Sequence, residues 1–388
     1  MAGRQECRPD AGVREDGAFP PGGLPLRIGI DASALAKKER TGVARYVLSL
    51  VDGLGSIGEA AGEEFRLCYR LSRLRRAVHF HRVRRPNFAV RVFQEGFTPL
   101  LARRLDVFHG PDLRIPRLGK VPCVATVHDV FSMDSDAYAD PGFRARKEGI
   151  YRDLADRARF LLFVSSHARD RFLAHFPVEA GRVRVVPEGV DARFGAVTEA
   201  AVAETRARLG LPREYLLWVG QITARKNAVR VLEALARLPP TTPPLVMAGN
   251  RKHGHEEVLE AFHRLGLGTR VRFPGHVSDR DLPALYAGGR ALVFPSLDEG
   301  FGLPLVEAFA AGLPALASTA GALPETAGGA ALLVDPKDVD ALADGIRRLL
   351  GDEDLRRDLV ARGRARAAEL TWEETARRTL GVYREAAR

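Results

Sequence analysis

Short apolar runs alternate with amphipathic, helix-like stretches along almost the whole chain. In the first half, apolar runs predict strands at 26–31, 88–93, 106–110, 121–127, 160–164 and 183–186, and helices over 42–54 and 166–176. The second half repeats this rhythm, with predicted strands at 215–219, 245–248, 271–273, 291–294, 314–317 and 331–334 and helices over 228–238, 256–265, 279–287 and 304–311. Several runs are rich in Val and Phe without strict alternation, which is typical of strands buried on both faces.

Alternating strands and helices predict an α/β fold with two doubly wound parallel sheets, each covered by helices on both faces. The rhythm pauses at 187–212, so we place the boundary between two Rossmann-like domains there. The predicted parts are a disordered leader at 1–25, an N-terminal domain at 26–195, a C-terminal domain at 196–370 and a final segment at 371–388. Two such domains face each other across a cleft, where ligands bind beyond the carboxyl ends of the strands.

The composition fits a globular protein of this size. The chain has 388 residues, of which 46% are hydrophobic, enough for two ordinary domains. No apolar run reaches the ~18 residues that a membrane span needs. The leader lacks the apolar region of a signal peptide, and Cys7, Cys68 and Cys123 are too far apart for a CxxC pair or a zinc motif. These features predict a cytoplasmic protein.

Positive charge is concentrated in the first half of the chain. The net charge is +10, and the stretch 65–94 holds nine arginines and no acid, with Leu71, Leu74 and Val78 at helical spacing. A solvated basic face is the simplest interpretation. The alternative is a peripheral surface that contacts anionic lipid, or a lipid-linked substrate, at the inner face of a membrane. Nucleic-acid binding is disfavoured because no recognised binding module accompanies the charge.

One loop combines acids, glycines and a proline. Residues 298–307 read DEGFGLPLVE and follow a predicted strand. Pro304 suits the start of a helix and Gly312 suits the position just beyond its end. The helix N-terminus carries unpaired N–H groups and a partial positive charge, which favours an anion.

The acids and glycines of this loop point to a sugar phosphate. Gly300 and Gly302 have no Cβ, so a ligand can approach their backbone closely. Glu299 and Glu307 can accept hydrogen bonds from hydroxyl groups in the same cleft. A glycine-rich turn followed by a helix with a solvated glutamate is the alternative interpretation.

A second loop supplies cations. Arg225 and Lys226 follow the strand predicted at 215–219 and precede a helix. Cations at this position neutralise phosphate oxygens and stabilise a leaving diphosphate. An exposed basic turn is the alternative, but two such loops after strands of the same domain favour a binding site.

The first domain has matching loops. Gly42 opens a predicted helix after the first strand, where it can contact a phosphate, although a flexible loop with Thr41 as N-cap is the alternative. His128 directly follows the strand at 121–127 and would face the cleft. A histidine at a strand end can also be purely structural.

Together these loops resemble the family-4 glycosyltransferases of the GT-B fold. The motifs that carry the resemblance are E-x7-E at 299–307, RKN at 225–227, GHVSD at 275–279, TGVARY at 41–46, VHD at 127–129 and PEGVD at 187–191, which is similar to the family's PNGVD. The resemblance extends from about residue 26 to the C-terminus and is most specific in the second domain. It implies that the N-terminal domain binds the acceptor, that the C-terminal domain binds a nucleotide sugar, and that 371–388 form a helix crossing back to the N-terminal domain.

The resemblance also implies roles for the matching side chains. Arg225 and Lys226 would bind the donor diphosphate, and Glu299 would hold hydroxyls of the donor sugar. Glu307 would bind the ribose hydroxyls of the nucleotide. His128 would approach the sugar from the first domain, so that His128, Glu299, Arg225 and Lys226 form the expected catalytic set.

Further positions complete the expected site. Donor contacts are implied for Gly220, Val277, Gly300, Phe301, Gly302 and Leu303, with the backbone of Val277 near the base. Gly42 and Arg45 would border the diphosphate and the acceptor. Two departures stand out, since Gln221 replaces a common arginine and Glu188 replaces the asparagine of PNGVD.

The expected activity is retaining transfer of a hexosyl group from a nucleotide-diphosphate sugar, with GDP-mannose as the predicted donor. The acceptor would be a glycan or a lipid-linked sugar in polysaccharide assembly. We expect no cofactor and no metal, although Asp134-Ser135-Asp136 matches the DxD motif of metal-dependent transferases of another fold. An epimerase or phosphorylase on this fold is one alternative; another is a degenerate module that binds nucleotide or anionic membrane without turnover.

Overall fold

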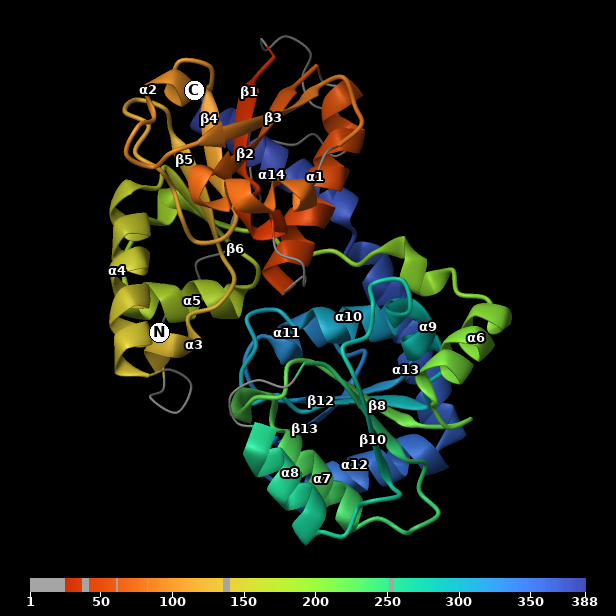
Figure 1. The fold of residues 1–388 in the computed structure, drawn as a ribbon. Helices are drawn as coiled ribbons and strands as arrows, with labels where there is room; N and C mark the ends of the chain where they lie inside the picture. Colours follow the sequence, from red (N-terminus) through yellow and green to blue (C-terminus); the bar gives the residue numbers. More distant parts are fainter. Residues whose placement is uncertain (1–24, 37–41, 61, 82, 135–139, 251–254) are drawn as a thin grey trace, which may run out of the picture.

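The computed structural model describes residues 25–36, 42–60, 62–81, 83–134, 140–250 and 255–388, so almost all of the predicted leader lies outside it. Figure 1 shows two lobes, each built from one parallel sheet between layers of helices. The predicted fold class, two doubly wound parallel-sheet domains, is therefore confirmed.

The first sheet has seven parallel strands in the order β3-β2-β1-β4-β5-β6-β7. Its strands are β1 (Arg27–Asp31), β2 (Glu64–Arg70), β3 (Phe88–Phe93), β4 (Val107–Gly110), β5 (Cys123–Val127), β6 (Phe160–Phe163) and β7 (Val183–Val185). The helices of this lobe are α1 (Gly42–Ala60), α2 (Pro99–Ala102), α3 (Phe131–Asp134), α4 (Pro141–Arg157) and α5 (Ser166–His175), with a 3-10 helix at Leu71–His79. The strands predicted for this half all form, with bounds that differ by at most two residues.

The second sheet has six parallel strands in the order β10-β9-β8-β11-β12-β13. They are β8 (Leu216–Val219), β9 (Leu245–Ala248), β10 (Val271–Gly275), β11 (Ala291–Phe294), β12 (Ala315–Ser318) and β13 (Leu332–Val334). The remaining helices are α6 (Glu199–Leu209), α7 (Ala228–Ala236), α8 (His255–Arg264), α9 (Leu282–Ala287), α10 (Leu303–Ala310), α11 (Leu323–Ala327), α12 (Val339–Gly351), α13 (Glu353–Glu369) and α14 (Trp372–Ala386).

The arginine-rich stretch is not a single solvated face, because its beginning forms strand β2. Arg66 and Arg70 belong to this strand, and each side chain is only 13% exposed. Arg70 forms ion pairs with Asp31 (2.7 Å) and Glu95 (2.6 Å), acids that lie outside the stretch. The sequence pattern concealed β2 because charged residues interrupt its apolar alternation.

Alternate residues of the second sheet are buried in two different layers. Leu216 and Trp218 of β8 pack in the layer that contains α7, α8 and α12. Leu217 and Val219 face the α10 layer, whose core is continuous with that of the first lobe. Burial on both faces explains the unbroken apolar runs of these strands.

The last helix returns to the first lobe. Helix α14 packs against α1, as Figure 1 shows in the upper lobe. Buried His109 of β4 contacts the Tyr383 hydroxyl (2.7 Å) through Nδ1, and burial lowers the pKa of His109 to about 3. Where the chain crosses between lobes, a Cβ on Gly189 would lie 2.2 Å from the Trp372 nitrogen, so this position requires glycine. The domain bounds themselves stay a prediction.

Candidate functional site

The loops that follow β8, β11 and β13 are joined by one side chain. Asn227 has a left-handed backbone (φ 59°), a conformation that asparagine tolerates better than most residues. Its buried amide Nδ2 donates to the carbonyls of Pro295 (3.0 Å) and Pro336 (2.6 Å). The Leu297 nitrogen also donates to the Arg225 carbonyl (2.8 Å). These bonds hold the basic loop and the acidic loop in one fixed arrangement.

Glu299 lies between the two predicted cations. Its Oε2 atom is 3.0 Å from Nη1 of Arg225, and Oε1 accepts a hydrogen bond from Lys226 Nζ. Burial alone would raise the pKa of Glu299, but the nearby charges of Arg225 and Lys226 outweigh it and lower the pKa to about 2. The carboxylate is therefore ionised throughout the physiological range.

The two cations differ in their surroundings. Burial lowers the pKa of Lys226 despite the attraction of Glu299. Burial also opposes the charge of Arg225, but Glu299 and Asp129 raise its pKa. The Lys226 ammonium lies 4.6 Å from the ring centre of Phe294, and the Arg225 guanidinium lies 4.9 Å from that of Phe131 in the first lobe. Aromatic faces stabilise both cations without neutralising them.

The helix that carries Glu307 begins and ends as its sequence predicts. Gly302 is its N-cap with φ 102°, Pro304 lies in the first turn, and Gly312 follows its end with φ 70°. The Glu307 side chain, only 6% exposed, accepts hydrogen bonds from Arg45 Nη1 (3.0 Å) and from the Tyr286 hydroxyl (2.7 Å). Arg45 comes from α1, so this bond connects the two lobes.

The environment of Glu307 differs from that of Glu299. Burial raises the pKa of Glu307, and one arginine together with one hydroxyl does not offset it. Asp279 adds to the rise, and it also forms an ion pair with Arg45, whose Nε lies 3.4 Å from its Oδ1. The pair of Glu307 and Arg45 thus joins α10 of the second lobe to α1 of the first.

His128 lies where the two lobes meet, but its ring is held within the first lobe. Nδ1 lies 3.0 Å from Glu188 Oε1, and Nε2 lies 2.9 Å from the Pro111 carbonyl. Both partners are acceptors, so the arrangement is complete only when both ring nitrogens carry hydrogen. Burial opposes that charge, but Glu188 outweighs it and raises the pKa of His128. Tyr46 packs edge-on against the ring at 4.6 Å.

The acidic loop contacts the first lobe through Gly300. A Cβ at this position would lie 1.7 Å from the His128 carbonyl oxygen, so only glycine fits. The Gly300 carbonyl also accepts a hydrogen bond from the Ser165 hydroxyl (2.6 Å). Nearby, Glu325 of α11 accepts from the backbone nitrogens of Ser166 and His167 at the start of α5. Gly300 is therefore a contact between lobes as well as a predicted donor contact.

The backbone conformation favours glycine at two further positions, since φ is positive at both Gly220 and Gly302. Gly220 has φ 151°, and a Cβ there would lie 3.3 Å from the Lys226 Cε atom. A Cβ on Gly302 would lie 2.5 Å from Leu323 Cδ2. Both positions support the geometry of the loops around Glu299, whatever contact they make with a ligand.

The remaining predicted residues lie in loops and at helix ends of the two lobes. Phe301 is buried, and its carbonyl accepts from the Thr326 hydroxyl (2.6 Å). Leu303 opens α10, and buried Val277 follows β10. Gly42 is the exposed first residue of α1, and a Cβ there would contact nothing within 4 Å.

Sequence reasoning missed several residues that complete the site. Tyr286, Asp279 and Glu188 contact Glu307, Arg45 and His128, respectively. Glu188 gave a usable signal, because it departs from the family's asparagine. Asp279 ends the GHVSD motif but was given no role, and Tyr286 gave no signal, since a tyrosine near a short helix is common.

The described residues include neither a candidate metal cluster nor a helix that could span a membrane. Among the residues that the structure describes, no group of three or more His, Cys, Asp or Glu side chains could hold a metal ion. Asp134 instead pairs with Arg171 and accepts from His175 (2.9 Å), whereas Asp136 lies outside the described residues. No described helix is both long enough and apolar enough to span a bilayer.

Comparison with known proteins agrees with this geometry. Residues 40–194 match the family described as Glycosyltransferase Family 4, and residues 203–366 match Glycosyl transferases group 1. The O-antigen chain mannosyltransferase B of Escherichia coli is 32% identical over 287 residues, which cover 72% of this chain and 74% of that protein. The serotype-specific mannosyltransferase WbdA of Escherichia coli is 31% identical over 268 residues, 66% of this chain but only 32% of that longer protein.

Solved structures show the same architecture. Sucrose-phosphate synthase of Thermosynechococcus elongatus superposes with a TM-score of 0.74 at 21% identity, covering 93% of this chain and 99% of that one. HepE of Anabaena, in complex with UDP and glucose, also gives 0.74, at 18% identity, with 93% and 100% covered. With these matches over both lobes, the chain belongs to the family-4 glycosyltransferases of the GT-B fold.

Proposed function

We propose that this glycosyltransferase moves a hexosyl group, with retention at the anomeric carbon, from a nucleotide-diphosphate sugar to a glycan or lipid-linked acceptor. The observation that carries the proposal is the cluster of Arg225 and Lys226 around Glu299, at the carboxyl ends of β8 and β11. The mannosyltransferases among the relatives favour GDP-mannose as the donor and polysaccharide assembly as the setting.

The cluster suits a leaving diphosphate. Glu299 orients Arg225 and Lys226, and its own charge keeps both cations stable in a buried site before the donor arrives. An arginine carries five N–H donors and a lysine three, so donors remain for phosphate oxygens after the contacts to Glu299. Preorganised cations stabilise the negative charge that develops as the glycosidic bond breaks.

No protein nucleophile is required in this proposal. The leaving phosphate accepts the proton of the acceptor hydroxyl, on the same face of the sugar from which it departs. Positioning then supplies much of the rate enhancement. Glu307 would exchange its bonds to Arg45 and Tyr286 for ribose hydroxyls, and the charged His128 ring would add a positive potential near the sugar. The chemistry needs no metal ion.

An assay of donor cleavage tests this function. Purified protein is incubated with GDP-mannose, UDP-glucose, UDP-N-acetylglucosamine, ADP-glucose or dTDP-rhamnose and a panel of mannosides, and the released nucleoside diphosphate is measured. We expect one donor to be turned over, with a loss of at least about 100-fold in Lys226→Met. Lys337→Met, an exposed lysine of the same domain, is the matched control and should retain activity.

The outcomes separate the alternatives. NMR of the product's anomeric proton distinguishes retention from inversion. Turnover that survives Lys226→Met would refute the diphosphate assignment. Nucleotide binding without turnover of any donor would instead support a degenerate module.

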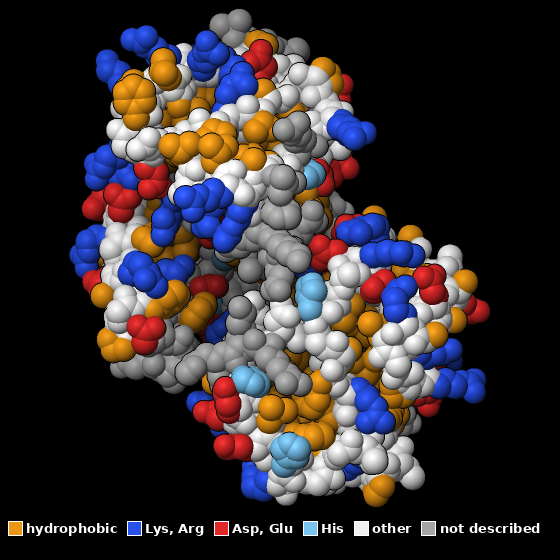
Figure 2. Space-filling view, in the orientation of Figure 1, with side chains coloured by type: hydrophobic (Ala, Val, Ile, Leu, Met, Phe, Trp, Pro, Cys, Tyr) orange, Lys and Arg blue, Asp and Glu red, His pale blue; other side chains and the backbone are white. Residues whose placement is uncertain are grey.

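We also propose a membrane-facing surface on the first lobe. Figure 2 shows basic and apolar side chains mixed on this lobe. Exposed apolar residues include Leu74 (49%), Phe97 (65%) and Leu100 (67%), and the arginines Arg75, Arg76 and Arg91 are exposed beside or between them in the sequence. Apolar side chains with arginines suit anionic lipid headgroups.

Vesicle sedimentation tests the membrane surface. We expect binding to vesicles containing phosphatidylglycerol at low salt, weaker binding in Phe97→Ser with Leu100→Ser, and release by salt. Equal behaviour with neutral vesicles, or an unchanged double variant, would refute it.

A further inference from the structure

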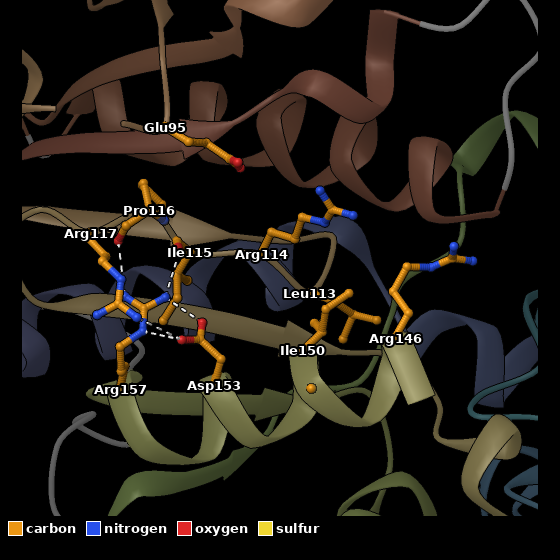
Figure 3. Close-up of a pocket in the computed structure, with 11 residues that line it drawn as sticks. Glu95, Leu113, Arg114, Ile115, Pro116, Arg117, Arg146, Ile150, Asp153 and Arg157 are labelled. Atoms are coloured by element: carbon orange, nitrogen blue, oxygen red, sulfur yellow. Dashed lines mark hydrogen bonds and ion pairs between the residues drawn. The ribbon is translucent and has the colours of Figure 1, made fainter. Parts of the chain in front are cut away.

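A pocket opens in the first lobe, away from the cluster of Arg225, Lys226 and Glu299. It has a volume of about 410 Å³ and lies between the loop after β4 and helix α4 (Figure 3). Leu113, Ile115 and Ile150 form an apolar wall, and Arg114 and Arg146 extend along it. Nothing in the proposed reaction uses these two arginines.

The pocket is a built feature of the fold. Leu113 has φ 60°, a left-handed conformation that an ordinary residue keeps only where its surroundings impose it. The same turn requires glycine at position 110, since a Cβ on Gly110 would lie 2.0 Å from the Arg114 carbonyl oxygen. Arg157 of α4 supports the loop by donating to the Ile115 carbonyl (2.9 Å). The left-handed backbone at Leu113 and the hydrogen bond from Arg157 together fix the shape of the loop.

The acids of the pocket are already paired, but two of its cations are not. Glu95 pairs with Arg70 (2.6 Å), and Asp153 pairs with Arg157 (2.5 Å). Among the described residues, Arg114 and Arg146 have no carboxylate within 4.0 Å; the only specific contact of Arg146 is with the ring of Phe143, at 5.4 Å. Two unpaired guanidinium groups beside an apolar wall suit an anionic group attached to a sugar.

The loop that lines the pocket also contacts His128. Pro111, at the start of its loop, provides the carbonyl that accepts from His128 Nε2 (2.9 Å). Lys147 lies on α4, where burial lowers its pKa and the charges of Asp129 and Arg114 act on it in opposite directions. The pocket and His128 are therefore supported by the same loop of the first lobe.

We propose that this pocket is an acceptor subsite in which Arg114 and Arg146 bind an anionic group of the acceptor, either a phosphoryl group or the carboxylate of an acidic sugar. This inference rests on the proposed transfer reaction and names the class of its acceptor. The apolar wall contacts a sugar face, and the guanidinium groups hold the charge. The anion then fixes which acceptor hydroxyl reaches the donor.

Ligand-observed NMR titration tests this subsite directly. The probes are methyl mannoside 6-phosphate, methyl glucuronoside and neutral methyl mannoside, each added to wild type, to Arg114→Gln with Arg146→Gln, and to Lys226→Met. We expect the charged probes to bind wild type at least about tenfold more tightly than the neutral one. The double arginine variant should lose that difference, and Lys226→Met should keep it.

Two more variants control for shape and for net charge. Gly149 lies in helix α4 on the pocket surface, where a Cβ would contact nothing within 4 Å, so Gly149→Leu fills space without strain. It should weaken both charged probes. Arg152→Gln removes an arginine of the same helix that pairs with Glu148 (2.7 Å) outside the pocket, and it should change nothing.

Each outcome has a defined meaning. A preference for the phosphate probe identifies a phosphoryl group, and a preference for the glucuronoside identifies an acidic sugar. Equal binding of charged and neutral probes, or a charge preference lost only in Lys226→Met, would overturn the subsite. Failure of the transferase function would appear separately, as an absence of donor cleavage in wild type.

Discussion

Glu299 and Glu307 are both buried carboxylates in one short segment, but their surroundings have opposite effects. Glu299 lies between two cations of its own lobe, which hold its pKa at about 2. Glu307 has one arginine from the other lobe, one tyrosine hydroxyl and a neighbouring aspartate, and its pKa is raised. Both carboxylates are buried, so the number of adjacent cations decides whether the pKa is lowered or raised.

The difference suggests two roles. The Glu299 cluster is a permanent part of the second lobe. Arg225, Lys226 and Glu299 all lie on the loops after β8 and β11, which hydrogen bonds hold together. The Glu307 cluster depends on Arg45 of α1, so it exists only while the lobes are close together. We expect the first cluster to provide the charge for catalysis and the second to respond to the nucleotide.

Glu299→Gln should have the largest effect, because it leaves two buried cations without their carboxylate. We expect a loss of at least about 100-fold in kcat/KM and of about 3 kcal/mol in the free energy of unfolding. Glu369→Gln, which breaks an exposed pair with Arg366, should cost less than about 0.5 kcal/mol. Steady-state kinetics and urea unfolding measure both quantities, and similar losses in the two variants would remove the distinction between the clusters.

Acid stability tests the state of Glu299 directly. A carboxyl with a lowered pKa adds stability above its ordinary value of 4.5 and loses it as the pH falls toward about 2. Between these limits, wild type should lose about 3 kcal/mol more than Glu299→Gln. The contribution of Glu307 to the pH dependence of stability has the opposite sign. Because its pKa is raised, it reduces stability as the pH rises above 4.5. Parallel stability curves for wild type and Glu299→Gln would contradict the lowered pKa.

A double-mutant cycle measures the contact between lobes. Arg45→Gln and Glu307→Gln each break the 3.0 Å pair, and the cycle should give a coupling energy of about 1 kcal/mol. Arg45→Gln alone should also increase the radius of gyration by X-ray scattering, because the lobes lose a bond. If the coupling energy were near zero, Arg45 would not be a partner of Glu307 in solution.

Glu188→Gln should have the smallest effect. A histidine with a raised pKa stabilises the fold below its ordinary value of 6.5 and loses that contribution as the pH rises through the folded pKa. Burial opposes the charge of His128, and the charged groups that favour it are Glu188 and Asp129. We expect a loss of about 0.5 kcal/mol at pH 6 and a smaller one at pH 9. The same loss at both pH values would mean that Glu188 acts without holding His128 charged.

The sequence allowed much of the fold to be predicted, because strands buried on both faces leave unbroken apolar runs. Strand β2 escaped because arginines interrupt it, and their partners Asp31 and Glu95 come from other parts of the chain. The loops with Arg225, Lys226 and Glu299 were predicted because motif residues lie at the ends of neighbouring strands. Their mutual contacts depend on side-chain geometry that spacing does not determine.

Contacts between the lobes could not be predicted from the sequence. Arg45 and Glu307 are 262 residues apart, and no local pattern relates them. Gly300 illustrates the same limit. Its sequence context predicted that a ligand could approach the backbone closely. In the structure, the His128 carbonyl oxygen also lies where a Cβ would be.

Calorimetric titration with nucleotide sugars is the most direct test of the central claim, that the loops of the second lobe bind a nucleotide-diphosphate sugar. GDP-mannose, UDP-glucose, UDP-N-acetylglucosamine, ADP-glucose and dTDP-rhamnose are each titrated into wild type and into Glu307→Ala. We expect one donor to bind wild type and to lose at least about tenfold in affinity in the variant. Folded wild type that binds none of the donors, or a donor whose affinity is the same in both proteins, would contradict the claim.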